Sequence, residues 1–326
     1  MQKGVLLFNL GGPENLQDVR PFLYNLFSDP EIIRIKSDVL RKTLAWLIAS
    51  MRQGKSRNLY RQIGGGSPLR KITENQAAAL RDALRIKGEN TGVYVGMRCW
   101  NPTIDEAVER ILRDGITQLV LLPLFPQYSV TTTGSCLKYF QGIDEKRGLS
   151  ARMEITTVTS WFDEPLYIEA MADLIREGLR GFSGGGEEKI HLLYTAHSIP
   201  LSYVEKGDPY LEQTKRSVEL INALLGNVHP FTLAFQSKVG PVKWLGPSTR
   251  DALVRLGQAG NARVLAVPVS FVSDHIETLQ EIDIQYKELA AQSGICEFRR
   301  ADSLNVHPKF IAALSALSAR GNEPRE

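Results

Sequence analysis

The sequence predicts an α/β protein with two similar Rossmann-like domains, each a four-stranded parallel sheet flanked by helices. Short runs of Val, Leu and Ile alternate with helical stretches along the whole chain. This alternation is typical of parallel sheets whose strands are joined by crossover helices. In addition, the segment LVLLPLFPQYS around Pro123 resembles VLAVPVSFVSD around Pro268. The similarity indicates an internal duplication.

Eight apolar runs are the candidate strands, and they form two sets of four. They span residues 4–10, 92–97, 118–124 and 153–158 in the first set, and 189–195, 230–235, 263–270 and 296–300 in the second. A glycine-rich stretch, residues 181–186, precedes the fifth run and predicts a turn or linker. We expect a first domain over residues 1–160, a second over 161–310, and a tail over 311–326 whose last helix packs back on the first domain.

The two halves differ most between their first and second strands, where the first half carries about 50 extra residues. Within this insertion, residues 32–63 hold eight basic residues and one acid, Asp38. Aliphatic residues and Trp46 are interleaved with the charges. A basic amphipathic helix of this kind can lie on an anionic membrane or line an apolar pocket. The alternative is a helix packed on its own domain. We carry forward a membrane-surface contact through residues 32–57 as a hypothesis.

Composition excludes several classes of protein. The 39 basic and 36 acidic residues give a net charge of +3, too even for a general nucleic-acid binder. The apolar runs are shorter than the roughly 20 residues that a membrane span requires. The N-terminus predicts a strand and not a signal peptide, and the three cysteines lie far apart with no CxxC pair. We therefore expect a cytoplasmic protein, with the insertion as a candidate contact to the inner face of the membrane.

Ligands of doubly wound sheets bind at the carboxyl ends of the strands, so we expect the functional residues in the loops at those ends. Nucleotide binding is disfavoured, because GxGxxG is absent and Ala49 stands where a P-loop ending at residues 54–56 needs its first glycine. The apolar and aromatic residues near these loops suit a large flat organic ligand, although each one alone is more often part of a core. They are Phe8, Leu10, Tyr60, Phe125, Tyr128, Trp244 and Phe271.

His197 is the first candidate for chemistry. It follows a strongly apolar strand and lies among small and hydroxyl residues. A neutral imidazole there can accept a proton or bind a metal. The alternative is a histidine that only makes structural hydrogen bonds.

The segment SDHIETLQEID is the second candidate. In an α-helix, Asp274, Glu277 and Glu281 share one face at i, i+3 and i+7. Such a row of carboxylates can carry protons or a hydrated divalent cation, since hard oxygen ligands bind these ions weakly enough to release them. The alternative is an ordinary helix start, because Asp274 and Glu277 also have capping-box spacing. One histidine with these acids is incomplete as a resident zinc site, which suggests that the metal is a substrate.

Seven segments, in order along the chain, resemble the ferrochelatase family, whose members insert ferrous iron into a porphyrin late in haem synthesis. They are NLGGPENLQDVRPFLYNLFSDPEII, YRQIGGGSPL, VGMRCWNP, PLFPQYSVTTTGS, TAHSIPLSYVEKGDPY, FQSKVGPVKWLGPST and PVSFVSDHIETLQEIDI. The resemblance covers about residues 4–310 and implies two similar αβ domains around a porphyrin cleft.

The resemblance also implies roles for single residues. His197 and Glu277 match the family's paired catalytic residues, and Asp274, His275 and Glu281 match the polar path to that acid. These five residues are the candidate metal contacts. The porphyrin-facing positions match Leu10, Arg52, Tyr60, Ser67, Arg98, Tyr128, Ser129, Trp244 and Phe271. Arg52 and Ser67 are candidates for binding the propionates, because guanidinium and hydroxyl groups suit carboxylates.

The expected activity is that of a lyase-class chelatase that binds a bent macrocycle and takes its two pyrrole protons, with His197 as the acceptor. Fe²⁺ is then a substrate and no cofactor is permanently bound. A [2Fe-2S] cluster, present in some members, is not expected because three distant cysteines cannot supply four thiolates. The NLGGP opening and the long basic insertion favour protoporphyrin IX as the substrate. Coproporphyrin III, a related precorrin or sirohydrochlorin chelatase, and a non-catalytic tetrapyrrole carrier are the alternatives.

Overall fold

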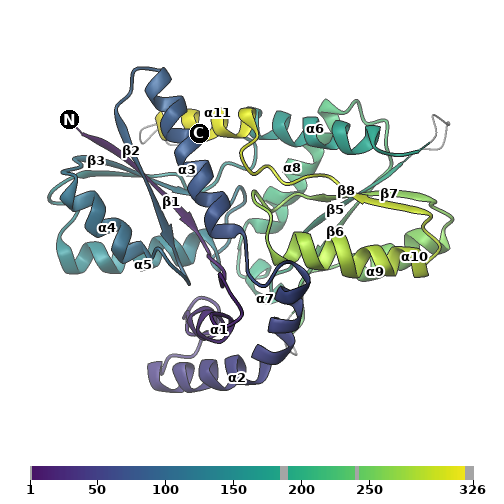
Figure 1. Cartoon of the computed structure of the whole chain (residues 1–326), viewed down its shortest axis with the longest axis horizontal. Helices are drawn as coiled ribbons and strands as arrows, with labels where there is room; N and C mark the ends of the chain where they lie inside the picture. Colours follow the sequence, from purple (N-terminus) through teal and green to yellow (C-terminus); the bar gives the residue numbers. More distant parts are fainter. Residues whose placement is uncertain (1, 184–189, 239–241, 320–326) are drawn as a thin grey trace. The chain divides into compact units, whose positions relative to one another are not determined.

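The chain folds into two compact units, each with its own parallel sheet (Figure 1). The computed structural model describes residues 2–183, 190–238 and 242–319. The first unit comprises Met1–Trp161 with Ile311–Glu326, and the second comprises Phe162–Phe310. Of the predicted glycine-rich linker and fifth strand, residues 184–189 lie outside the described residues.

The two sheets have the same strand order, and all of their strands are parallel. The first contains β1 (Lys3–Asn9), β2 (Thr91–Met97), β3 (Gln118–Pro123) and β4 (Glu154–Thr157), in the order β2-β1-β3-β4. The second contains β5 (His191–His197), β6 (Phe231–Gln236), β7 (Arg263–Pro268) and β8 (Glu297–Arg300), in the order β6-β5-β7-β8. The predicted fold class of two similar four-stranded Rossmann-like sheets is confirmed, and every predicted strand is present within two residues of its expected ends.

Helices connect and cover the strands of each unit. The first unit contains α1 (Val19–Phe27), α2 (Asp38–Gln62), α3 (Leu69–Ile86), α4 (Ile104–Arg113), α5 (Thr133–Arg147) and most of α11 (Pro308–Ala319). The second contains α6 (Pro165–Arg180), α7 (Leu201–Val204), α8 (Tyr210–Leu224), α9 (Thr249–Gln258), the π-helix η1 (Glu277–Tyr286) and α10 (Lys287–Gln292). In the first unit, Lys87 Nζ donates to Ser315 Oγ (2.8 Å), which ties α11 to α3.

Each sheet buries alternate side chains under a pair of helices. In the first unit, Leu6, Phe8 and Leu121 pack against α4 and α5, which lie together on one face of the sheet (Figure 1). Thr103 and Glu106 begin α4 with a capping box, so its apolar face starts in register with the strands. In the second unit, β5, β6 and β7 bury Leu193, Ala234 and Val264 against α9 and η1. Full burial of such side chains contributes about 1.5–3 kcal/mol each for the larger aliphatics.

The loop after β1 is a turn that only glycine fits. Gly11 has a φ of +90°, and a Cβ there would lie 2.7 Å from Trp100 Cβ. At Gly12 a Cβ would lie 2.7 Å from Ser67 Oγ. The NLGGP segment therefore uses its glycines for close packing at the carboxyl end of the sheet.

Helix α2 has an unusual distribution of side chains. Its buried face carries small residues such as Ala45 and Ala49, whereas Val39 (74% exposed) and Met51 (75% exposed) point to solvent, with Leu40, Trp46 and Leu47 also exposed. Helix α2 packs on α1 of its own unit, as the alternative expects, but these five apolar side chains stay exposed. Among the described residues, no helix combines the length and hydropathy needed to cross a bilayer.

Candidate active site

His197 is the last residue of β5, at the carboxyl edge of the second sheet. Its Nδ1 atom lies 2.8 Å from Glu277 Oε2. The backbone on both sides of its Cα is anchored, because its N–H donates to Ser270 Oγ (3.0 Å) and its carbonyl accepts from Tyr210 Oη (2.9 Å). The His197 side chain is 40% exposed, so the edge that carries Nε2 is available for chemistry.

Ser237 joins the two glutamates of η1. Its Oγ lies 2.7 Å from Glu277 Oε2 and also contacts Glu281 Oε2, while its N–H donates to Glu281 Oε1 (3.2 Å). Ser237 follows β6 directly and has a φ of +65°. Positive φ is costly for a residue with a Cβ and is characteristic of functional loops. Gln236, the last residue of β6, also donates from Nε2 to Glu281 Oε2 (3.1 Å).

Glu277 and Glu281 both lie on the π-helix η1. Residues four apart share one face of a helix, and Ser237 Oγ contacts both of these side chains. Runs of π-helix are rare and often mark functional sites. Tyr286, the last residue of η1, donates from Oη to Glu281 Oε1 (2.8 Å).

The charges of these groups are strongly interdependent. Partial burial would raise the pKa of Glu277, but the charge and hydrogen bond of His197 outweigh burial and lower this pKa to about 2. Burial would lower the pKa of His197, but Glu277 outweighs it and raises this pKa. Burial and the nearby charge of Glu277 together raise the pKa of Glu281. The site therefore stabilises the imidazolium of His197 once it takes up a proton, beside a carboxyl group that holds its proton more tightly than usual.

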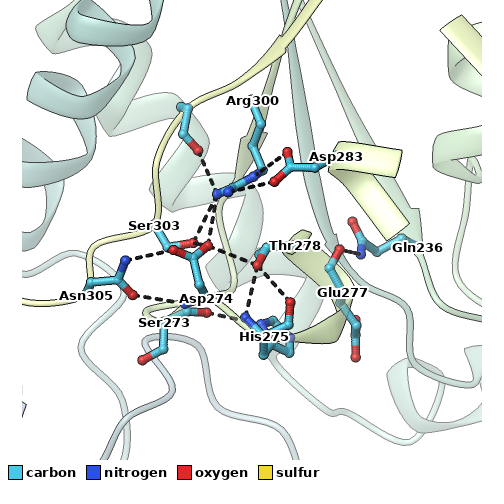
Figure 2. A network of polar contacts seen from close by, with 11 residues as sticks. Gln236, Ser273, Asp274, His275, Glu277, Thr278, Asp283, Arg300, Ser303 and Asn305 are labelled. Carbon is cyan, nitrogen blue, oxygen red and sulfur yellow. Dashed lines mark hydrogen bonds and ion pairs between the residues drawn. The ribbon is translucent and has the colours of Figure 1, made fainter. Parts of the chain in front are cut away.

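Asp274 does not join this row of carboxylates. Its oxygens accept from Ser303 Oγ (2.8 Å) and Asn305 Nδ2 (2.8 Å), and Arg300 lies 3.1 Å away (Figure 2). The predicted face of three carboxylates is wrong, because η1 begins only at Glu277 and Asp274 lies in the preceding loop. Burial would raise the pKa of Asp274, but Arg300 and the hydrogen bonds outweigh it and lower this pKa.

His275 is turned toward its own loop. Its Nδ1 lies 3.1 Å from the carbonyl oxygen of Ser273, and its ring centroid is 4.7 Å from that of Phe271. Burial lowers the pKa of His275 and favours the neutral ring. Among the described residues, no three His, Cys, Asp or Glu side chains are arranged as a metal site. The five candidate metal contacts thus separate into the chain His197–Glu277–Glu281 and the loop residues Asp274 and His275.

Most of the expected porphyrin-facing residues belong to the first unit. Leu10 follows β1, and its N–H donates to Asn9 Oδ1 (2.8 Å). Arg52 on α2 is half-buried, with its guanidinium 5.7 Å from the centroid of the Phe27 ring, and burial lowers its pKa. Ser67 Oγ accepts from the N–H of Leu69 (3.3 Å).

Three more of these residues are also in the first unit. Tyr60 and Ser129 are buried, and Tyr128 is half-buried. Ser129 Oγ lies 3.1 Å from Thr131 Oγ1. In the second unit, Trp244 is half-buried beside Pro200, and Phe271 packs on His275.

Arg98 lines a cavity of about 730 Å³ in the first unit. Its guanidinium pairs with the fully buried carboxylate of Asp29 (3.0 Å) and donates to Ser135 Oγ (2.9 Å). It also lies 4.4 Å from the centroid of the Tyr139 ring. The structure therefore holds Arg98 by partners that the sequence did not indicate.

Sequence reasoning missed Ser237, Gln236, Tyr286 and Arg300 as members of the site. Ser237 lies in the loop after β6, at the end of a strand, but no pattern in the sequence singles out this serine. Arg300 lies at the end of the last strand and is far in sequence from Asp274 and Asp283, the two acids that it contacts.

The fold is that of chelatases. The chain superposes on the structure of SirB from Bacillus subtilis with Fe³⁺ at a TM-score of 0.55 and 13% identity, over 98% of this chain and 96% of that one. A second structure, the sirohydrochlorin chelatase SirB from Bacillus subtilis subspecies spizizenii in complex with cobalt, gives a TM-score of 0.52 and 14% identity, over 96% of this chain and 92% of that one. At these identities the likeness concerns the fold alone.

The sequence comparisons show the family. The family model of ferrochelatase matches residues 2–321. The ferrochelatase of Gloeothece citriformis is 51% identical over 96% of this chain and 81% of its own length. That of Gloeobacter violaceus is 51% identical over 96% of both chains. The chain belongs to the ferrochelatase family, which confirms the resemblance seen in its sequence.

Proposed function

We propose that this protein inserts Fe²⁺ into protoporphyrin IX and releases two protons. Family membership supports a metal-chelating enzyme of haem synthesis. The observation that carries the proposal for the site is the contact of His197 Nδ1 with Glu277 Oε2 (2.8 Å) at the carboxyl edge of the second sheet. This pair couples a proton acceptor to a group that stabilises it once it is charged.

The chemistry of the macrocycle defines what the site must do. A free-base porphyrin is nearly flat, and two N–H protons occupy the position that iron must enter. An enzyme lowers the barrier by binding a bent form more tightly than the flat one. In this proposal, His197 Nε2 accepts the pyrrole protons in turn, and the carboxylate of Glu277 stabilises the imidazolium that forms.

The released protons need a route away from His197. Ser237 Oγ contacts one oxygen of each glutamate. A hydroxyl group donates a single hydrogen, so both contacts are favourable when one of the carboxyl groups is protonated. The raised pKa of Glu281 makes it the better holder of that proton. We infer that protons pass from His197 through Glu277 and Ser237 to Glu281.

Iron enters this proposal as a substrate. The carboxylate oxygens of Glu277 and Glu281 are hard ligands suited to a brief contact with a hydrated divalent cation. We propose no resident cofactor. Arg52 and Ser67 remain our candidates for the propionates, since a guanidinium can bind a carboxylate through two parallel hydrogen bonds.

We also propose that α2 contacts an anionic membrane surface. Its exposed apolar side chains, with Val39 and Met51 about three-quarters exposed, are accompanied by exposed Lys36, Lys42 and Lys55. Apolar burial in the interface and attraction of lysine to anionic lipid then act together. A porphyrin is a poorly soluble, apolar substrate, and a membrane-facing helix would place the protein where such a substrate partitions.

An anaerobic assay of the purified protein tests the main proposal. Fe²⁺ is supplied with protoporphyrin IX or, separately, with coproporphyrin III, and the loss of free-base fluorescence is followed. We expect faster insertion into protoporphyrin IX, and a loss of at least about 100-fold in His197→Ala. Preference for coproporphyrin III would overturn the substrate assignment. Tight porphyrin binding without insertion would identify a carrier instead.

A further inference from the structure

One buried arginine holds both ends of the segment that carries the candidate acids. Arg300 is the last residue of β8, and its side chain is 9% exposed. Its Nε and Nη2 donate to the two carboxylate oxygens of Asp283, at 2.8 and 2.9 Å. Its Nη1 lies 3.1 Å from Asp274 Oδ1. The guanidinium therefore bridges Asp274 and Asp283 (Figure 2), which precede and follow Glu277 in the sequence.

The surroundings of Arg300 satisfy almost all of its donors. Its Nη1 also donates to the carbonyl oxygen of Ala301 (3.3 Å) and to Ser303 Oγ (3.4 Å). A buried guanidinium is costly unless it is paired and fully hydrogen-bonded. The bidentate contact with Asp283 is the geometry that arginine forms and lysine cannot form. The position thus requires arginine and not just a positive charge.

Asp274 is equally well satisfied, which argues against its acting as an open ligand. Its Oδ1 accepts from Thr278 Oγ1 (3.0 Å) and Ser303 Oγ (2.8 Å) in addition to Arg300, and its Oδ2 accepts from Asn305 Nδ2 (2.8 Å). Three of these partners contact Oδ1 and one contacts Oδ2, so both carboxylate oxygens are already held by the protein. The contacts fix Asp274 as an anchor.

The anchored segment contains His275, Glu277 and Glu281. Asp274 precedes η1, and Asp283 lies inside it. We propose that Arg300 is a positioning residue that clamps residues 274–283 and so fixes where Glu277 meets His197. This proposal rests on the proposed function of the His197–Glu277 pair. It assigns Asp274 and Asp283 to the clamp and not to a route for iron or protons.

The test compares Arg300→Lys with Arg299→Lys in the full chain. Arg299 is the preceding residue on β8, its side chain is 46% exposed, and it pairs with Glu297. Lysine at position 300 keeps the charge but loses the bidentate contact. We expect kcat for metal insertion to fall by about 10- to 100-fold, the usual scale for a misplaced catalytic group, while KM for porphyrin stays within about twofold of wild type. Arg299→Lys should match wild type in both constants.

Asp283→Asn is a second variant for the case in which Arg300→Lys folds poorly. Asp283 is 37% exposed, so the substitution is milder, and we expect a smaller fall in kcat in the same direction. Urea unfolding of each variant separates loss of fold from loss of position. Unchanged kcat in a folded Arg300→Lys protein would overturn the proposal, as would a parallel change in KM and kcat.

A crystal structure of Arg300→Lys provides a readout that does not depend on activity. We expect the distance between His197 Nδ1 and Glu277 Oε2 to lengthen beyond hydrogen-bonding range. If the wild-type protein lacks insertion activity but this contact still breaks in the variant, the clamp stands and only the proposed function fails. If the contact is retained, the clamp is refuted whatever the activity.

Discussion

The two edges of the His197 ring face different surroundings. Nδ1 meets Glu277, and the opposite edge carries Nε2 on a side chain that is 40% exposed. The carboxylate thus fixes the orientation of the ring and stabilises its charged form. A proton acceptor held in this way works only at a pH where the imidazole is neutral, which makes the rate of insertion dependent on the pKa of His197.

We predict that Glu277→Gln moves the acid limb of the pH–rate profile to lower pH. Removing the carboxylate removes what raises the pKa of His197, so the imidazole loses its proton at a lower pH than in the wild type. The maximal rate should fall by about 10²-fold or more, because the imidazolium is no longer stabilised. The measurement is kcat against pH with Zn²⁺, which is not oxidised in air.

Glu288→Gln is the control for this prediction, since Glu288 is exposed on α10. Glu288→Gln should keep the acid limb of the pH–rate profile and the maximal rate of the wild type. A limb that moves to higher pH in Glu277→Gln would contradict the assignment of His197 as the proton acceptor.

Asp274 makes stability depend on pH. Its pKa is lowered in the folded protein, so its contribution is present above the pKa of an unfolded aspartate and is lost as pH falls through the folded value. We predict that Asp274→Asn costs about 3 kcal/mol of unfolding free energy near neutral pH. The difference from wild type should shrink as the pH falls below about 4. Urea unfolding followed by fluorescence at several pH values measures this.

A substitution of the same kind at an exposed aspartate is the control. Asp82 on α3 is 67% exposed and lies in an ion pair of 3.7 Å with Arg85. Asp82→Asn should have little effect at any pH, because exposed pairs contribute at most about 1 kcal/mol. A constant penalty for Asp274→Asn across the whole pH range would refute the linkage.

The strands could be predicted from sequence because a buried parallel strand leaves a local signal. Each is a short run of apolar residues bounded by turn-forming residues, and the two strands that end at Pro123 and Pro268 repeat the same proline spacing. The π-helix left no such signal. The pattern of residues 274–284 fits an α-helix, and only the structure shows that Glu277 begins a π-helix with Asp274 outside it. Arg300, which pairs with Asp274 and holds it in the loop before η1, lies 26 positions later in the sequence.

Part of the site was also predictable. His197, Glu277 and Glu281 were identified from their position after apolar strands and from helical spacing, and the structure links them. Ser237 was not identified, because a serine in a loop has many ordinary uses. Its role depends on a positive φ and on two carboxylates brought to it by another element.

The α2 helix shows why composition alone left its orientation open. Its many apolar residues fit either an inward or an outward face, and the deciding detail is that alanines occupy the buried face. We predict that Met51→Glu weakens binding to phosphatidylglycerol vesicles by about tenfold or more, since it replaces an apolar side chain worth about 1.5–3 kcal/mol on burial. Cosedimentation at low salt measures the binding.

Ile86→Glu offers a matched control, because Ile86 is also an exposed aliphatic residue (85%) but lies at the end of α3. It should bind vesicles like the wild type. Insertion into detergent-dispersed porphyrin should be unchanged in both variants. Equal vesicle binding by Met51→Glu and wild type would remove the support for the membrane proposal.

The duplication relates each position of one unit to a position of the other. Pro123 pairs with Phe8 in the first sheet, and Pro268 pairs with Thr195 in the second. Phe8 and Thr195 are therefore corresponding positions. Leu10 lies two residues after Phe8, and His197 lies two residues after Thr195, so Leu10 corresponds to His197. The segments NLGGP and AHSIP lead to the same correspondence, since both end in proline. One copy of the duplicated unit therefore has an apolar side chain directly after its first strand, at the position where the other has His197, the proposed proton acceptor.

This asymmetry predicts different kinetic effects at two corresponding positions. We expect Leu10→Ala to raise KM for protoporphyrin IX severalfold, because it removes apolar surface that the bound porphyrin would cover, at a cost of about 1–3 kcal/mol. The acid limb of the pH–rate profile should stay in place, since Leu10 carries no proton. His197→Ala should lower the rate of insertion by at least about 100-fold at every pH. Full pH–rate profiles of the two variants with Zn²⁺ distinguish these effects. A shifted acid limb in Leu10→Ala would mean that both units contribute to proton transfer. It would refute the assignment of proton transfer to the second unit alone.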